Sequence, residues 1–222
     1  MHRHFDDELQ GLNQELIKMS EMVKTAINHS VTALDQRDRQ MAEEVISKDN
    51  EIDLMEIHID EVCIDLIAKH QPMASDLRLI TTGMKINADL ERMADLAVNI
   101  CQRVLEIVNQ DPITPPADIS KLSLMAENMI NDSITAFIES NLQMAKQVMT
   151  SDDQADKLRN DIKEDLLKNY MEKDPSTSRR AVALLLITRH LERICDHATY
   201  VAEEVIYLMK GKIVKHHFQE LP

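Results

Sequence analysis

The chain contains 222 residues, and its 25 lysines and arginines against 39 aspartates and glutamates give a net charge of −14 with histidine neutral. Three glycines, six prolines and 3% aromatic residues are too few for the turns and strands of a sandwich or barrel. An all-β fold is therefore excluded and an all-α fold is expected. The acidic balance also argues against a nucleic-acid partner, because such binding depends on neutralising phosphates with Lys and Arg.

Helical periodicity dominates the chain and predicts six long helices. Apolar residues recur at intervals of three and four from Leu9 to Leu34 and from Met41 to Ala68. The Gln71–Pro72 step ends the second helix, because the residue before a proline is disfavoured in the α region. The other helices are expected over about 72–109, from the following linker to 140, over 141–171, and from the turn at 174–176 to 210, with Gly211 as the C-cap residue.

A proline-rich segment divides the chain into two similar halves. Residues 109–118 (NQDPITPPAD) contain three prolines. Residues 31–53 match 134–156 after a shift of 103 positions, and residues 78–97 match 179–198 after a shift of 101. We therefore predict a tandem of two three-helix bundles with long antiparallel helices, as in spectrin repeats. Residues 1–110 would form the first repeat, 111–118 the linker and 119–222 the second repeat.

Acidic pairs spaced i, i+4 are kept by both repeats. On a helix such residues share one face, where like charges cost roughly 0.2–0.5 kcal/mol per pair unless something offsets them. A solvated helix face would not require two repeats to keep the same pairs. The pairs are Asp49 with Asp53, Glu91 with Asp95, Asp152 with Asp156, and Glu192 with Asp196.

Each hairpin brings two of these pairs to the same height. The pairs lie about equally far before and after the turns near Gln71 and Asp174, so antiparallel helices place them level to within about 3 Å. Four carboxylates in each repeat would then form a hard-cation site. The alternative is a solvated acidic face. Glu56 and Asp60 have the same spacing, but they correspond to Arg159 and Lys163 and are not kept.

The identity of the metal stays open among iron, zinc, manganese, magnesium and calcium. Carboxylates favour magnesium, calcium, manganese or ferric iron, whereas structural zinc normally brings Cys or His ligands. A di-iron oxidase bundle is disfavoured, because no glutamate is followed three residues later by a histidine. We expect metal ions as the only cofactors and no catalytic residues.

No membrane insertion is expected. The longest apolar run, Ala181–Ile187, has seven residues, whereas a spanning helix needs about 20. The first ten residues, MHRHFDDELQ, contain no apolar stretch typical of a signal peptide. Cys63, Cys101 and Cys195 form no CxxC pair and are typical of reduced, buried thiols. These features predict a cytoplasmic protein.

Two segments and four short motifs resemble the PhoU family of regulators of bacterial phosphate-specific transport. The segments are IAKHQPMASDLRLITTGMKINADLERMADLAVNI and SRRAVALLLITRHLERICDHATYVAEEV, and the motifs are DNEID, ERMAD, DDQAD and ERICD. The resemblance covers nearly the whole chain. It implies a cytoplasmic, usually dimeric protein that binds metal ions through these motifs, often as multinuclear clusters.

The resemblance further implies a negative regulator that restrains the phosphate-starvation response when phosphate is plentiful. Its partners would be the phosphate ABC transporter, with its ATPase, and a sensor histidine kinase. The alternative is a metalloenzyme, such as a metal-dependent phosphatase, that uses the carboxylate clusters to polarise a phosphoryl group. The sequence favours the regulator, because the repeats share no general acid, base or nucleophile beyond the carboxylates themselves.

Overall fold

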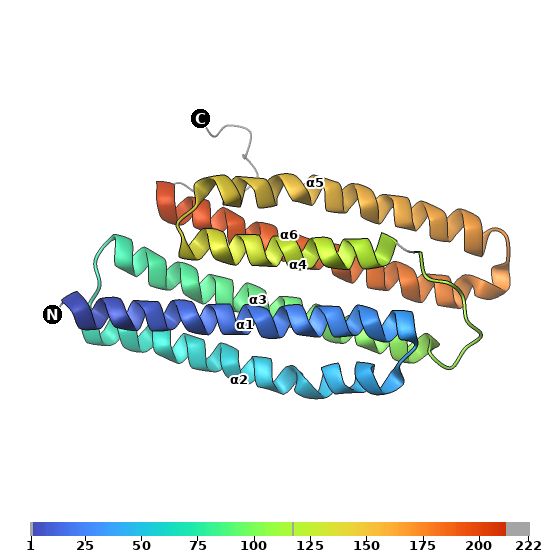
Figure 1. Cartoon of the computed structure of the whole chain (residues 1–222), viewed down its shortest axis with the longest axis horizontal. Coiled ribbons are helices and arrows are strands. Elements are labelled where there is room, and N and C mark those ends of the chain that lie inside the picture. The colour runs from blue at the N-terminus through green and yellow to red at the C-terminus, as the bar shows by residue number, and fades with distance from the viewer. Residues whose placement is uncertain (1, 117, 212–222) are drawn as a thin grey trace.

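The computed structural model describes residues 2–116 and 118–211, and these residues form helices with no strand among them. The expected all-α fold is therefore confirmed. Figure 1 shows the six α-helices, which are α1 (His2–Gln36), α2 (Arg39–His70), α3 (Ser75–Ile107), α4 (Asp118–Ile138), α5 (Leu142–Asp165) and α6 (Ser178–Lys210).

The helices form two three-helix bundles that lie side by side along their length (Figure 1). Helices α1, α2 and α3 contact one another, and so do α4, α5 and α6. The bundles meet through α3 against α6 and α1 against α4, while α2 and α5 contact only helices of their own bundle. The tandem architecture is confirmed, although residues 212–222 of the second predicted repeat lie outside the described residues.

The apolar stripes read from the sequence form one continuous core that runs through both bundles. Leu12, Leu16 and Met19 of α1 and Leu90 of α3 are fully buried. Burying one such side chain contributes roughly 1.5–3 kcal/mol. Gly83 of α3 lies against α1, since a Cβ there would stand 3.5 Å from Leu12 Cδ2. The core therefore depends on close approach of α1 and α3.

Helix ends differ from the sequence prediction where the backbone leaves α geometry. Gln71 adopts a left-handed conformation, and Ala74 also has a positive φ, so α3 begins at Ser75 rather than near Pro72. The fifth helix changes to a π-helical turn over Leu166–Met171 and is followed by a 3₁₀ turn at Pro175–Thr177. Gly211 closes α6 with φ +64°, as expected for a left-handed C-cap.

The turns between the first two helices of each repeat have the same backbone conformation and the same type of N-cap hydrogen bond. Arg37 and Ser140 adopt positive φ values of 54° and 51°. The next residues, Asp38 and Asn141, are N-caps whose side-chain oxygens accept hydrogen bonds from the backbone N–H three residues on, at 3.0 and 3.1 Å. The duplication thus extends to individual hydrogen bonds.

Two arginines, one in the turn after α1 and one near the start of α6, hold the connection between the repeats. The Arg37 guanidinium donates to the carbonyl oxygens of Val108 and Gln110, and that of Arg180 donates to the carbonyl of Asp111 at 2.6 Å. The proline-rich segment therefore lies against the ends of α1 and α6. The exact repeat boundaries proposed from the sequence stay a prediction.

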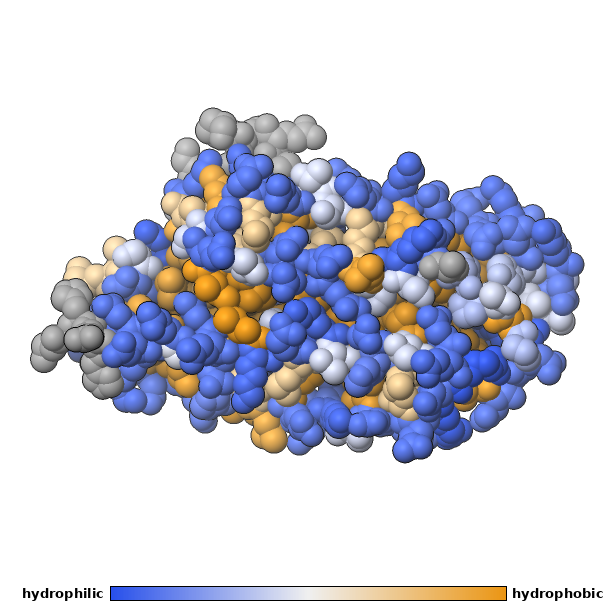
Figure 2. Space-filling model, viewed as in Figure 1, coloured by the Kyte–Doolittle hydropathy of each residue, from blue (hydrophilic) through white to orange (hydrophobic). Residues whose placement is uncertain are grey.

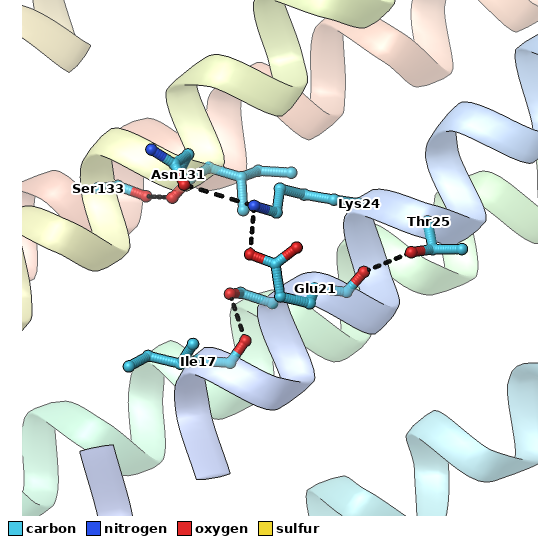
Figure 3. Close-up of polar contacts among 8 residues, drawn as sticks. Ile17, Glu21, Lys24, Thr25, Asn131 and Ser133 are labelled. Carbon is cyan, nitrogen blue, oxygen red and sulfur yellow. Dashed lines mark hydrogen bonds and ion pairs between the residues drawn. The ribbon is translucent and has the colours of Figure 1, made fainter. Parts of the chain in front are cut away.

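Polar contacts border the seam between the bundles. Lys24 of α1 contacts Glu21 at 2.6 Å and reaches Asn131 of α4 at 3.4 Å (Figure 3). Lys85 of α3 pairs with Glu204 of α6 at 2.8 Å. On the face shown in Figure 2 hydrophilic residues dominate, and hydrophobic residues gather mainly along the seam between α1 and α4. The bundles are thus joined by apolar packing with charged contacts at its margin.

Replacing either duplicated N-cap with alanine should destabilise the protein. Asp38→Ala and Asn141→Ala each remove the acceptor for an unsatisfied helix N–H, so each should lower the free energy of unfolding by about 1 kcal/mol. Urea denaturation followed by circular dichroism measures the loss. Asp38→Asn is the control, because asparagine caps equally well; equal losses for Asp38→Asn and Asp38→Ala would contradict this role of the side chain.

Candidate metal centres

The first acidic cluster lies between α2 and α3. Asp49 and Asp53 of α2 interact electrostatically with Glu91 and Asp95 of α3, and the coupling runs crosswise from Asp49 to Asp95 and from Glu91 to Asp53. Asp49 and Glu91 are half-buried, whereas Asp53 and Asp95 are exposed. The structure therefore brings together the four residues that the equidistance from the turn predicted to be level.

The charged forms of the two half-buried members, Asp49 and Glu91, are unfavourable at this place. Burial, followed by the charges of Asp53 and Asp95, raises the pKa of Asp49 to about 6. Burial also raises the pKa of Glu91, and the charge of Asp95 adds to this shift. Desolvation and like charges both favour the neutral form of a carboxyl group. A cation at this place would offset both effects.

The second cluster repeats this arrangement between α5 and α6. Asp152 and Asp156 of α5 interact with Glu192 and Asp196 of α6. Burial and the charges of Glu192, Asp152 and Asp156 raise the pKa of Asp196 to about 6. Burial likewise raises the pKa of Asp152. Both repeats thus hold four interacting carboxylates at equivalent positions.

A salt bridge distinguishes the second cluster from the first. The Arg159 guanidinium lies 2.9 Å from Glu192 Oε1 and 3.7 Å from Asp156 Oδ1. The equivalent position in the first repeat is Glu56, whose pKa is raised by burial and by Asp60 and Asp53. The second cluster therefore contains its own counter-charge, which the repeat comparison alone did not reveal.

Two further side chains border the second cluster. Thr199 is buried next to Asp152, and its hydroxyl acts to lower the pKa of that carboxyl against the larger, opposite effect of burial. Cys195 is fully buried, and burial together with the neighbouring carboxylates raises its thiol pKa. A neutral thiol is a poor metal ligand, because the thiolate is the species that binds metals. The interpretation of Cys195 as a small buried residue is therefore retained.

The donor set fits a hard cation, although the ligands are not gathered around one point. Within residues 2–116 and 118–211, no three His, Cys, Asp or Glu side chains are arranged to hold a metal ion. Coordination of one ion by three or more of these carboxylates would therefore require the side chains to move closer together. Oxygen-only ligands suit magnesium, calcium, manganese or ferric iron better than structural zinc.

Glu56 and Asp60, which the second repeat does not keep, lie beside the first cluster. Glu56 interacts electrostatically with Asp53 of the cluster and with Asp60, and Asn87 of α3 donates a hydrogen bond to Asp60 at 3.0 Å. Comparison of the two repeats excluded Glu56 and Asp60 from the predicted metal ligands, because their counterparts are Arg159 and Lys163. Their spacing of seven and eleven residues from Asp49 on the same helix was the signal that could have found them.

Comparison with known proteins identifies the family. The PhoU domain model matches residues 16–104 and again residues 119–205. The chain belongs to the PhoU family. It is 42% identical to the phosphate-specific transport system accessory protein PhoU homolog of Aquifex aeolicus, over 96% of each chain. It is 32% identical to the protein PhoU of Escherichia coli, over 96% of this chain and 88% of that one.

Solved PhoU structures share the same architecture. The crystal structure of PhoU from Pseudomonas aeruginosa superposes with a TM-score of 0.87 at 32% identity, covering 94% of this chain and all of that one. Both matched PhoU domains contain one acidic cluster each, since Asp49 to Asp95 fall in the first and Asp152 to Asp196 in the second. None of the described helices is long and apolar enough to span a membrane.

Stability of the chelator-treated protein should fall as pH rises through the window set by Asp49. The folded pKa of about 6 exceeds 3.8, the ordinary pKa of an aspartate in an unfolded chain, so the folded state binds more protons between these two pH values. Asp49→Asn should therefore match wild type near pH 4 and exceed it in melting temperature above pH 6. Thermal denaturation at several pH values tests this, with Glu61→Gln on the exposed face of α2 as the control. A constant difference across pH would refute it.

Proposed function

We propose that the chain is a cytoplasmic negative regulator of phosphate uptake and of the phosphate-starvation response. The observation that carries this proposal is the similarity to proteins named phosphate-specific transport system accessory protein PhoU, which extends over 96% of the chain. In this proposal the protein is a homodimeric adaptor between the ATPase of the phosphate ABC transporter and a sensor histidine kinase.

Metal ions bound at the two carboxylate clusters are part of this proposal. The ligands would be Asp49, Asp53, Glu91, Asp95, Asp152, Asp156, Glu192 and Asp196. A bound cation supplies positive charge that offsets carboxylate repulsion and draws two helices together. Each cluster joins an outer helix, α2 or α5, to an inner helix, α3 or α6. Metal binding would therefore stiffen the outer surface that is available to partners.

An enzymatic role receives less support. The relatives' names describe accessory proteins, which favours a non-enzyme. The phosphatase alternative requires a group that attacks or activates water beside the metal, and Cys195 is protonated and fully buried. Hydrolysis of phosphate esters by the purified protein, lost in Glu91→Ala, would establish the alternative.

Metal content per chain tests the binding role. Protein purified without chelator or affinity nickel should contain metal by elemental mass spectrometry, and the variant Asp49→Ala/Glu91→Ala should contain less. Saturating the site 100-fold should stabilise wild type by about 2.7 kcal/mol, because ligand binding to the folded state adds RT ln(1 + [L]/Kd). Glu61→Gln/Asp65→Asn is the control, since this pair shares α2 and the spacing but lies outside the cluster. Equal metal content in all three proteins would count against the clusters as ligands.

Regulation is tested in a bacterium whose own phoU gene has been deleted. A reporter of phosphate-starvation genes should be active in high phosphate in the deletion strain, and the wild-type chain should silence it. Failure of the wild-type chain to silence the reporter would contradict the regulatory role. A variant carrying Asp49→Asn, Glu91→Gln, Asp152→Asn and Glu192→Gln should fail to silence it while keeping its helical circular dichroism. Silencing by this variant would separate regulation from metal binding.

A further inference from the structure

A groove lined by positive side chains lies on the second repeat between α5 and α6. It encloses about 670 Å³. Arg159 and Lys163 of α5 and Arg189 and Arg193 of α6 line it. The whole chain has a net charge of −14, so this gathering of four cations contrasts with the rest of the molecule. The groove is therefore a positively charged surface on an acidic protein.

Most of these cations are not neutralised within the chain. Glu192 and Asp196 also line the groove, and the Arg159 guanidinium lies 2.9 Å from Glu192 Oε1. Lys163, Arg189 and Arg193 are exposed, and they form no hydrogen bond or salt bridge with any residue in 2–116 or 118–211. Three positive side chains thus remain available to a ligand.

The electrostatic environment of His190 reports the same concentration of positive charge. Burial lowers the pKa of this histidine, and the charges of Arg193, Arg103 and Arg189 lower it further. Positive neighbours disfavour the charged form of an imidazole. A third helix, α3, thus adds Arg103 to the cations of α6 at this end of the groove.

An apolar strip extends the groove toward the start of α6. Val182 is 43% exposed, and Leu185 and Leu186 are partly exposed. Their spacing from Arg189 and Arg193 places all five side chains along one side of the helix. From residue 182 to residue 196 the helix rises about 20 Å. This length exceeds a single small anion and suits a helical segment of about fourteen residues.

The first repeat has no equivalent surface. The counterparts of Arg159, Lys163 and Arg189 are Glu56, Asp60 and Ala88, and those of Val182, Leu185 and Leu186 are Thr81, Met84 and Lys85. Both the positive charge and the continuous apolar strip are therefore confined to the second repeat. A ligand that is acidic and apolar would be repelled by the carboxylates of the first repeat and directed to the second.

We propose that the groove between α5 and α6 binds an acidic amphipathic helix of a partner protein. Its carboxylates would face Lys163, Arg189 and Arg193, and its apolar side chains would pack on the strip that begins at Val182. Amphipathic helices commonly bind in grooves in this way, and charge complementarity supplies specificity and fast association. The second carboxylate cluster borders the groove, but the inference requires no bound metal and is tested separately from the proposed function.

Fluorescence anisotropy with the full chain tests the inference. The probe is a labelled helical peptide of about fourteen residues, with leucine at the first and fourth positions of each heptad and glutamate at most others. Wild type should bind it, with an affinity that falls as the salt concentration rises. Lys163→Glu/Arg193→Glu should weaken binding about tenfold or more while keeping its helical circular dichroism. Val182→Ser, at an exposed position, should also weaken it.

The matched control reverses two lysines on another side of α5. Lys157 and Lys168 are exposed and do not line the groove, so Lys157→Glu/Lys168→Glu should bind the peptide as wild type does. A second peptide with lysine in place of glutamate should bind Lys163→Glu/Arg193→Glu more tightly than wild type.

Two results would overturn the proposal. One is that wild type does not bind the acidic peptide, and the other is that Lys163→Glu/Arg193→Glu binds it equally well. If phosphatidylglycerol vesicles or inorganic phosphate bound wild type in place of the peptide, and this binding were lost in the variant, the groove would be a membrane or small-anion site and the partner helix would be wrong.

Discussion

The packing of α3 against α6 determines where every other element lies. These inner helices bury residues toward their own bundle and toward each other, so the two repeats share one core. Helices α2 and α5 contact only their own bundle and form the outer surfaces (Figure 1). Each carboxylate cluster lies where an outer helix meets an inner one, and repulsion within the cluster acts directly against that contact.

Because each cluster lies between an outer helix and an inner helix, a cation bound there would change how firmly the whole outer helix is held. The apolar core fixes α3, whereas the stability of α2 depends on packing along one side and on the charges facing Glu91 and Asp95. Burial and like charge raise the pKa of Asp49 to about 6, so its charged form is unfavourable in the folded state. Neutralising that charge strengthens the attachment of the outer helix without changing the core.

Periodic features could be predicted from the sequence, whereas individual side-chain contacts could not. Helix number, the tandem repeat and the level acidic pairs follow from spacing, because a helix has a fixed rise and a fixed period. The π-helical turn at Leu166–Met171 and the Asn87–Asp60 hydrogen bond depend on local backbone and rotamer choices that spacing does not encode. The salt bridge of Arg159 was also missed, because the repeat comparison identifies Arg159 as the counterpart of Glu56 but not the carboxylates that its side chain contacts.

The residues that differ between the two repeats change the charge around each carboxylate cluster. Replacing Glu56 and Asp60 by Arg159 and Lys163 exchanges two negative charges for two positive ones beside otherwise equivalent carboxylates. Because the attraction of a site for a divalent cation depends on its net charge, the second repeat must attract cations less strongly than the first. The Arg159–Glu192 pair also holds α5 to α6 without any metal. One half of the molecule therefore carries a salt bridge across its carboxylate cluster, whereas the other half has a further carboxylate, Glu56, at the position equivalent to Arg159.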